Sequence, residues 1–224
     1  MMIAVVAGTP VDTKMGVAIM EKEGYETLSY PMAKTPEDQT QLQYFSQEDL
    51  DRAFQDRISQ AKEKGAQGVY INCNSLSASL HYQEAEEKIG LPIITPLETY
   101  RNLPKDLTSV VVLAANGVSA YSVDEIIRES QPDIKTVCMG NLSIVESIEK
   151  EKDSSDIVRD LNLKGLLSYF EGIQDPDYRV DAIILACTHF PYIKEALQKE
   201  TTIPIIDPKD DMVNRLKQAL KARK

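Results

Sequence analysis

The sequence predicts an α/β fold in which parallel sheets are covered by helices on both faces. Short apolar runs rich in Val and Ile recur along the 224 residues, and longer segments with one charged face separate them. Continuous apolar strands that alternate with amphipathic helices are typical of buried parallel sheets. A further observation, an internal repeat of short segments, predicts that the chain forms two similar halves.

The strands are predicted where short runs of mostly apolar residues, many of them β-branched, contain no charge. They are Ile3–Ala7, Gly68–Ile71, Pro92–Ile94, Val110–Leu113, Ala182–Leu185 and Pro204–Ile206. Tyr25–Tyr30 and Ile134–Met139 are weaker candidates, since each contains one charged residue. The helices are predicted where charged residues leave one apolar face. They are Gln47–Lys64, Ser79–Ile89, Asp153–Tyr169 and Lys209–Lys221. We interpret the polar segment Met32–Gln47 as a loop with a short helical turn, which could form a flap over a site.

Pairs of similar segments indicate an internal duplication. Val69–Ser75 resembles Ile183–His189, since each is an apolar strand that ends in Cys and two polar residues. Leu91–Pro96 resembles Ile203–Pro208, and a weaker third pair lies at the first strand of each half. The pairs occur in the same order, and about half the chain separates the members of each. Parallel strands generally resemble one another, but that does not explain why Pro-Ile-Ile-x-Pro occurs twice after a strand-ending Cys.

The composition argues against some partners and predicts a compartment. Lys and Arg total 25 against 35 Asp and Glu, and the net charge of −10 argues against binding to nucleic acid or to anionic membranes. No apolar run approaches the roughly 20 residues of a membrane helix, and the N-terminus lacks the basic start of a signal peptide. We therefore expect a cytoplasmic protein. Its three cysteines, an odd number, do not indicate a disulfide framework.

Cys73 and Cys187 end equivalent strands of the two halves. In parallel α/β sheets, ligands bind at the carboxyl ends of the strands, so these thiols could approach one cleft from opposite sides. Such a pair suits racemisation, because one thiolate removes a proton from a carbon and the opposite thiol returns one to the other face. A helix N-terminus directly after each Cys would favour the thiolate, with Ser75 and Thr188 as caps. His189 could pair with Cys187.

Other interpretations of these residues remain open. A free Cys usually behaves as a small buried hydrophobe, and we expect that role for Cys138. A disulfide between Cys73 and Cys187 is disfavoured by a reducing compartment. A zinc site that includes His189 lacks a fourth ligand and any Cys-x-x-Cys pair. We therefore expect no metal at this site. No Gly-x-Gly-x-x-Gly or Walker sequence is present, so we expect no nucleotide cofactor either.

The residues around the two cysteines form short motifs. Cys73-Asn74-Ser75 and Ala186-Cys187-Thr188-His189-Phe190-Pro191 resemble the two cysteine motifs of the aspartate/glutamate racemase family. Pro92–Glu98 and Ile205–Asp207 resemble further stretches of that family, so the resemblance covers nearly the whole chain. It implies cofactor-independent isomerisation by two thiols in the cleft between two pseudo-symmetric α/β domains, often in a homodimer. The implied domains are residues 1–97 with 208–224, which hold Cys73, and residues 98–207, which hold Cys187.

The residues expected to hold the substrate depart from the family pattern. Where glutamate racemases have Asp-Ser-Gly after the first strand, this chain has Ala7-Gly8-Thr9-Pro10, with Asp12 slightly later. Asp12 could contact the substrate, or could simply lie in the first turn of a helix. Where the family has Ala-Thr-x-Gly-Thr, Asn116 and Ser119 could replace the two threonines, together with amides of a helix N-terminus. The candidate substrate contacts are Gly8, Thr9, Asp12, Asn74, Ser75, Asn116, Gly117 and Thr188.

The leading hypothesis is a racemase that interconverts the D- and L-forms of aspartate or glutamate, with Cys73, Cys187 and His189 as catalytic residues. The alternatives are an isomerase or decarboxylase of a related non-amino carboxylic acid, and a catalytically silent binding protein on the same scaffold. In each case the expected partner is a small amino acid or dicarboxylic acid. The sequence leaves open which acid is used, the oligomeric state and the role of the Met32–Gln47 loop.

Overall fold

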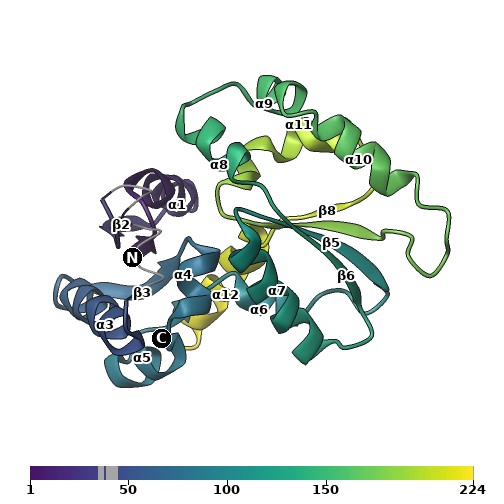
Figure 1. Cartoon of the computed structure of the whole chain (residues 1–224). Coiled ribbons are helices and arrows are strands. Elements are labelled where there is room, and N and C mark those ends of the chain that lie inside the picture. Colours follow the sequence, from purple (N-terminus) through teal and green to yellow (C-terminus); the bar gives the residue numbers. More distant parts are fainter. Residues whose placement is uncertain (35–37, 39–44, 224) are drawn as a thin grey trace. The chain divides into compact units, whose positions relative to one another are not determined.

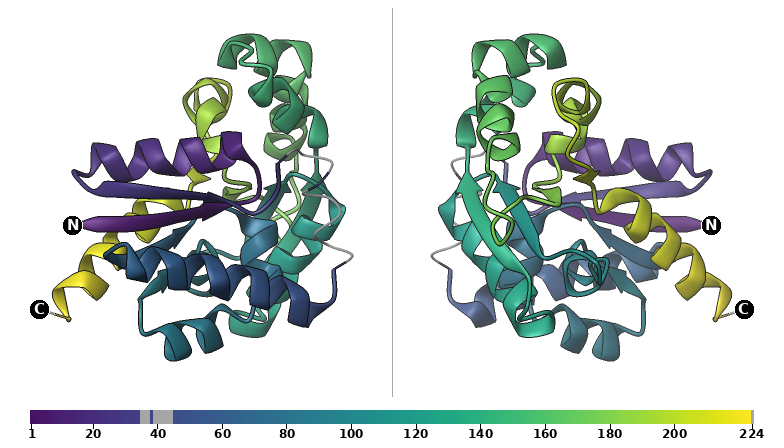
Figure 2. Two further views of the ribbon diagram at one scale, coloured as in Figure 1. Left: turned by 90° about the vertical axis from the view of Figure 1, so that its left-hand side faces the viewer. Right: turned by 90° about the vertical axis from the view of Figure 1, so that its right-hand side faces the viewer.

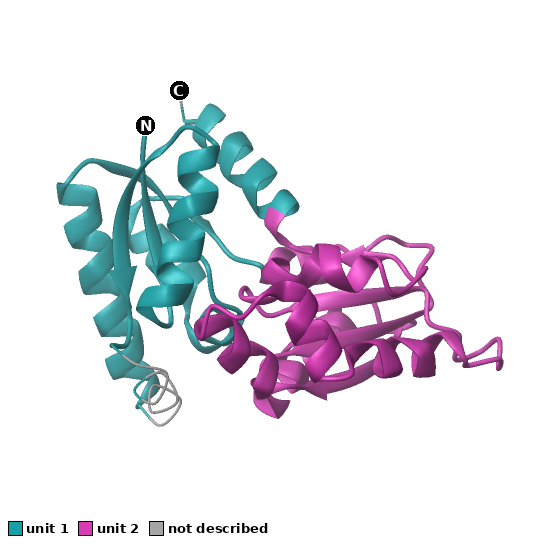
Figure 3. Cartoon of the chain, turned by 90° about the horizontal axis from the view of Figure 1, so that it is seen from above, with its two compact units in different colours: residues 1–96, 210–224 teal, residues 97–209 magenta. Residues whose placement is uncertain are grey.

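The computed structural model describes residues 1–34, 38 and 45–223. Most of the predicted Met32–Gln47 loop therefore lies outside the described residues. The chain divides into two compact units (Figure 3): residues 1–96 with 210–224 form unit 1, and residues 97–209 form unit 2. Each unit has its own parallel four-stranded sheet with helices (Figure 1), which confirms the predicted α/β class. Within the described ranges, no helix is both long and apolar enough to cross a membrane.

Unit 1 is built on a sheet with the strand order β2-β1-β3-β4. Its strands are β1 (Met2–Ala7), β2 (Glu26–Pro31), β3 (Ala66–Ile71) and β4 (Ile93–Ile94). All pairs are parallel, and Val6 of β1 is paired with Ile71 of β3. The residues that follow β1 and β3 therefore lie at the same edge of the sheet. The four predicted strands of this half are confirmed.

Helices cover both faces of this sheet. α1 (Pro10–Lys22) lies on one face, and α3 (Gln47–Glu63) with α5 (Tyr82–Ile89) lies on the other (Figure 2). α12 (Lys209–Lys221) packs on the same side as α1. The buried residues that join it to the core of unit 1 are Met212, Val213, Leu216 and Leu220, packed with Ile3, Val5, Met20 and Tyr70. Gly68 of β3 permits this close packing, because a Cβ there would lie 3.2 Å from Leu216 Cδ1.

The helix predicted over Ser79–Ile89 is confirmed as α5, which begins at Tyr82, and a separate short helix precedes it. α4 (Asn74–Ser79) ends at Leu80, whose φ of −110° and ψ of 143° are extended, and α5 begins at Tyr82. The break is stabilised from α3. The backbone N–H of His81 donates to Asp51 Oδ1 at 3.0 Å, and the His81 ring lies 2.7 Å from Asp51 Oδ2.

Unit 2 repeats the arrangement of unit 1, with the strand order β6-β5-β7-β8. Its strands are β5 (Ser109–Ala114), β6 (Lys135–Gly140), β7 (Ala182–Ala186) and β8 (Ile205–Ile206). All pairs are parallel, and Ala114 of β5 is paired with Ala186 of β7. The residues that follow β5 and β7 therefore lie at one edge of this sheet. The predicted strands of the second half are confirmed as well.

The helices of unit 2 surround a core centred on β5 and β7. They include α6 (Leu97–Arg101), α7 (Gly117–Ser130), α8 (Leu142–Glu149), α9 (Ser154–Asp160), α10 (Leu163–Glu171) and α11 (Lys194–Gln198). The prediction of one helix over Asp153–Tyr169 is wrong, because α9 and α10 are separate. Asn162 between them has a φ of +49°, a left-handed conformation that a continuous right-handed helix does not contain.

Cys138 corrects a further expectation, because it is exposed rather than buried. It lies on β6, the edge strand that pairs with β5. Four of the six β6 residues are exposed, whereas all six β5 residues are buried. An edge strand has a neighbouring strand on one side only. A cysteine in a short apolar run can therefore be exposed there, as Cys138 is.

Candidate active site

Cys73 lies directly after β3, at the junction with α4. The N–H of Asn72 donates to Val6 O at 2.8 Å, which ties this strand end to β1. Cys73 is extended, with φ −164° and ψ 121°, and is 4% exposed. Its Sγ lies 3.4 Å from Ser75 Oγ. A helix does begin directly after Cys73, but Ser75 is inside its first turn and contacts the thiol, so it is not the cap that the sequence predicts.

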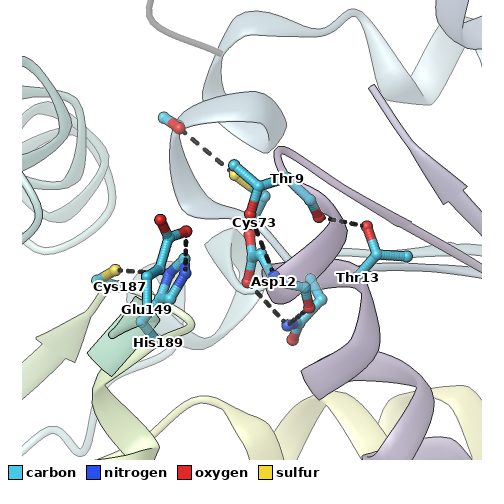
Figure 4. Close-up of polar contacts among 9 residues, drawn as sticks. Thr9, Asp12, Thr13, Cys73, Glu149, Cys187 and His189 are labelled. Atoms are coloured by element: carbon cyan, nitrogen blue, oxygen red, sulfur yellow. Dashed lines mark hydrogen bonds and ion pairs between the residues drawn. The ribbon is translucent and has the colours of Figure 1, made fainter. Parts of the chain in front are cut away.

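A buried hydrogen-bonded network lies at the same sheet edge (Figure 4). Thr9 is the N-cap of α1, and its Oγ1 accepts the N–H of Asp12 at 3.2 Å. Asn72 Nδ2 donates to both the main-chain O and the Oδ1 of Asp12, at 3.0 and 3.1 Å. Thr9, Asp12 and Asn72 are 1%, 1% and 2% exposed. Asp12 thus lies in the first turn of a helix, as one interpretation predicts, with its carboxylate held at the edge that carries Cys73.

Cys187 lies directly after β7 and is 7% exposed. Its Sγ is 3.7 Å from His189 Nδ1, and His189 itself is 4% exposed. The sequence predicts that Thr188 caps a helix here. Instead, Thr188 lies in a turn closed by the bond from Phe190 N–H to Cys187 O, and a 3₁₀ helix (Phe190–Ile193) follows. No helix N-terminus directly follows Cys187, so the expected stabilisation of its thiolate by a helix does not apply. The neighbouring imidazole is the group that can act on this thiol.

Glu149 is a site residue that the sequence analysis misses. It ends α8, and its Oε1 lies 3.2 Å from His189 Nε2, opposite the ring nitrogen that faces Cys187 (Figure 4). The Glu149 side chain is only 17% exposed. When Nε2 carries the proton that bonds Glu149, Nδ1 presents its lone pair toward the thiol. The imidazole can then accept the thiol proton, and the carboxylate stabilises the imidazolium that forms.

Asn116 lies in the turn between β5 and α7, and Gly117 begins α7, at the sheet edge that also carries Cys187. Asn116 is the N-cap of α7, and its Oδ1 accepts the N–H of Ser119 at 2.9 Å. A Cβ on Gly140 would lie 2.3 Å from Asn116 C, so β6 closes tightly onto this turn. The turn is therefore fixed on both sides. Asn116 has a structural role as a cap, in addition to any contact with substrate.

The candidate residues gather in two groups, one in each unit. Unit 1 carries Gly8, Thr9, Asp12, Cys73, Asn74 and Ser75 at the carboxyl edge of its sheet, and unit 2 carries Asn116, Gly117, Cys187, Thr188 and His189 at the equivalent edge. In the part of the chain that the structure describes, no group of three or more His, Cys, Asp or Glu side chains is arranged to hold a metal ion. The chemistry that these groups offer is proton transfer by thiol, imidazole and carboxylate.

Comparison with known proteins identifies the family. The model of the Asp/Glu/Hydantoin racemase family matches residues 21–216, a span that includes both strand-end cysteines. The chain belongs to the Asp/Glu/hydantoin racemase family. This racemase family membership confirms the resemblance that the two cysteine motifs indicate.

Relatives within the racemase family are distant. The chain is 27% identical over 157 residues to a glutamate racemase of Aliivibrio fischeri and 32% identical over 159 residues to one of Haemophilus influenzae. Each alignment covers 68% of this chain and 56% of the relative, so the chain spans little more than half the length of these curated relatives. A crystal structure of Francisella tularensis glutamate racemase with D-glutamate has the same fold. Its TM-score is 0.74 at 23% identity, covering 99% of this chain and 81% of the other.

Proposed function

We propose that this protein is a cofactor-independent racemase that interconverts the D- and L-forms of an acidic amino acid, aspartate or glutamate. Cys73 and Cys187 are the two acid/base groups. One thiolate removes the α-proton, and the other thiol returns a proton to the opposite face of the carbon. The observation that carries the proposal is that two buried cysteine thiols occupy equivalent strand ends in two sheets of equivalent strand order.

The surroundings of the thiols support this chemistry. The distance of 3.7 Å from Cys187 Sγ to His189 Nδ1 provides a proton acceptor for a thiol that must ionise. The distance of 3.2 Å from His189 Nε2 to Glu149 Oε1 supports that role, because the carboxylate favours the charged ring. In this proposal His189 is a catalytic residue and Glu149 is a positioning residue that acts through it.

The substrate contacts are proposed from residues at the two sheet edges. In unit 1, Thr9, Asp12, Asn74 and Ser75 would offer hydroxyl, carboxylate and amide groups, with the backbone of Gly8. The Asp12 carboxylate suits an ammonium group, since a buried negative charge binds a cation strongly. In unit 2, Asn116, Gly117 and Thr188 would offer amide and hydroxyl donors to a carboxylate. The net charge of −10 does not attract an anionic substrate, so these local donors must bind it.

Isotope exchange in deuterated water tests the proposal. In a two-base reaction that starts from L-glutamate or L-aspartate, the D-product takes deuterium at the α-carbon, while the L-substrate recovered early stays largely protonated. Mass spectrometry of the two separated enantiomers measures both quantities. Equal deuterium in substrate and product at early times would instead indicate a single base and would contradict the assignment of two thiols.

Single cysteine variants provide the matched controls. We expect Cys73→Ser and Cys187→Ser each to lower racemisation by at least about 10³-fold, since each removes one acid/base group. Cys138→Ser should leave the rate unchanged, because Cys138 is exposed within an edge strand and is not one of the two strand-end thiols. Full activity in either of the first two variants would overturn the mechanism. Thermal stabilisation by amino acids without any turnover would indicate a silent binding protein instead.

The departures from the family pattern favour one alternative function. Ala7 and Gly8 stand where glutamate racemases carry the Asp-Ser pair, and Ala115 and Val118 stand where they carry the two threonines. The same thiols could serve an isomerase or decarboxylase of a related non-amino carboxylic acid. A panel of D- and L-amino acids without turnover, together with consumption of a dicarboxylate such as maleate, would select this alternative.

A further inference from the structure

Asn72, which precedes Cys73, is the second residue that the structure adds to the candidate site. It follows β3 and lies on the same face as Tyr70, toward α1. Its side chain reaches a different element, because Nδ2 bonds both the main-chain O and the Oδ1 of Asp12, 60 positions earlier in the chain. These two bonds fix the first turn of α1 and the orientation of one carboxylate at the same time.

The packing around Asn72 leaves little freedom. A Cβ on Gly16 of α1 would lie 2.8 Å from Asn72 Cβ and 2.7 Å from Val5 Cγ1, so only a glycine lets α1 approach this closely. Asn72 and Asp12 are 2% and 1% exposed, and so the carboxylate is buried. A buried carboxylate needs hydrogen-bond donors, and the donor that Asn72 supplies belongs to the residue next to the thiol-bearing Cys73.

We propose that Asn72 is a positioning residue that holds the Asp12 carboxylate, and with it a fixed negative charge, beside the strand end that carries Cys73. The inference rests on the proposed function, because it assigns Asp12 to the substrate ammonium group and Cys73 to acid/base chemistry. The carboxylate then comes from helix α1, rather than from the strand end where Ala7 stands. A carboxylate on a helix can be displaced when the helix shifts. Asn72 prevents this displacement, because it bonds both the helix backbone and the carboxylate.

Two single substitutions test separately the charge of Asp12 and the bonds from Asn72 that hold it in place. Asp12→Asn removes the charge and keeps an Oδ1 that accepts the bond from Asn72. Asn72→Ala keeps the charge and removes both donor contacts. We expect each variant to lower kcat/KM by roughly 10- to 100-fold, since a misplaced group near the reacting atoms has effects of that size. The double variant should be no more than about twofold worse than Asp12→Asn, because the two residues act through the same charge.

The double-mutant cycle distinguishes this role from a purely structural one. If Asn72 only anchors α1, Asn72→Ala should lower kcat/KM by the same factor with or without the Asp12 charge, and that outcome would overturn the proposal. The double variant also covers the possibility that Asn72→Ala does not fold, because it no longer contains the buried Asp12 carboxylate. Asn214→Ala, at an exposed asparagine of α12 in the same unit, is the matched control and should have no effect.

A second readout does not depend on racemase activity. In a Cys138→Ser, Cys187→Ser background, only Cys73 reacts with iodoacetamide, and its rate can be followed against pH. Asp12→Asn should move the midpoint of this profile to lower pH, because a nearby negative charge disfavours the thiolate. Asn72→Ala should move it in the same direction, since the carboxylate is no longer held. Unchanged midpoints in both variants would overturn the inference even if racemisation is confirmed, and shifted midpoints would support it even if the substrate is a different acid.

Discussion

The two strand-end thiols lie in similar positions of similar sheets but have different neighbours. Cys73 Sγ lies 3.4 Å from the hydroxyl of Ser75. Cys187 Sγ lies 3.7 Å from an imidazole nitrogen of His189, whose other nitrogen lies 3.2 Å from a carboxylate oxygen of Glu149. A hydroxyl can hydrogen-bond a thiol or a thiolate but does not take its proton near neutral pH, whereas an imidazole can. The duplicated halves therefore share their strand order and differ in proton chemistry.

This difference suggests how the proposed reaction is divided between the thiols. Because the imidazole of His189 can accept a proton from the Cys187 thiol, we expect Cys187 to act first as the base and Cys73 to act as the acid. The reverse reaction then starts from the opposite protonation state, which the protein reaches at the end of each forward turnover.

Among substitutions of the residues beside the two thiols, His189→Asn should have the largest effect, because it removes the proton acceptor of one thiol and leaves the other thiol unchanged. We expect kcat/KM to fall by about 10²-fold, the lower end of what a general base contributes. The fall should be equal in both directions, since the equilibrium constant between two enantiomers is one. At pH 7, alkylation of Cys187 should also slow, as measured by mass spectrometry of the labelled peptides.

Ser75→Ala is the matched variant on the side of Cys73. The Ser75 hydroxyl is not a proton acceptor at neutral pH. We therefore expect a smaller loss of kcat/KM than in His189→Asn, and little change in the alkylation rate of Cys73. Equal effects of the two substitutions would show that the hydroxyl and the imidazole serve the thiols in the same way. The comparison between the two thiols would then be wrong.

Glu149→Gln should have an intermediate effect, because it keeps a group that can bond His189 Nε2 but removes the negative charge. We expect a loss of roughly tenfold in kcat/KM, similar to other substitutions that act through a histidine. Alkylation of Cys187 at a fixed pH of 7 should also slow, since the imidazolium loses its stabilising carboxylate. Glu146→Gln, at an exposed residue of the same helix, controls for a general change in surface charge.

The parts of the site that the sequence predicts are those that depend on short-range order. The apolar strands, the Cys that ends each central strand and the pairing of His189 with Cys187 all involve residues close together in the chain. Glu149 could not be predicted in this way, because α8 was not among the predicted helices and 40 residues separate Glu149 from His189. Asn72 and Asp12 are 60 residues apart, and only the parallel pairing of β1 with β3 brings their strand ends to one edge.

The wrong predictions have a common physical origin. Ser75 and Thr188 are good capping residues by type, but the backbone at each position decides whether the hydroxyl faces an open N–H. At Cys73 the helix begins two residues too early for Ser75 to cap it, and at Cys187 a turn replaces the helix. Cys138 was expected in the core because its neighbours are apolar, yet an edge strand exposes such residues. Local composition does not show where a strand lies in its sheet.

The two histidines of the chain extend the comparison between the units. Each pairs with a carboxylate, but the His189 side chain is 5% exposed and the His81 side chain is 56% exposed. His81 and Asp51 lie beyond the C-terminal end of α4, the helix that begins after Cys73. Gln47 Nε2 also bonds Asp51 Oδ2 and Ser79 O, so this cluster fixes the end of α4 against α3. We expect it to contribute to the stability of unit 1 and not to proton transfer.

His81→Gln should have the smallest effect, and that effect should depend on pH. The hydrogen bond with Asp51 raises the pKa of His81 above its ordinary value of 6.5. Since the folded-state pKa is the higher one, the stabilisation is fully present below pH 6.5 and is lost as the pH rises through the raised pKa. Urea unfolding at pH 5.5 and at pH 8.5 should therefore show a larger loss of stability in His81→Gln at the lower pH. Asp51→Asn should give the same trend, and a loss of stability that does not change with pH would mean that His81 acts only through its packing.

Racemisation should stay within about twofold of the unmodified protein in both variants, because exposed ion pairs contribute little. A large loss of activity would place the end of α4 in the catalytic machinery and remove the contrast between the two histidines.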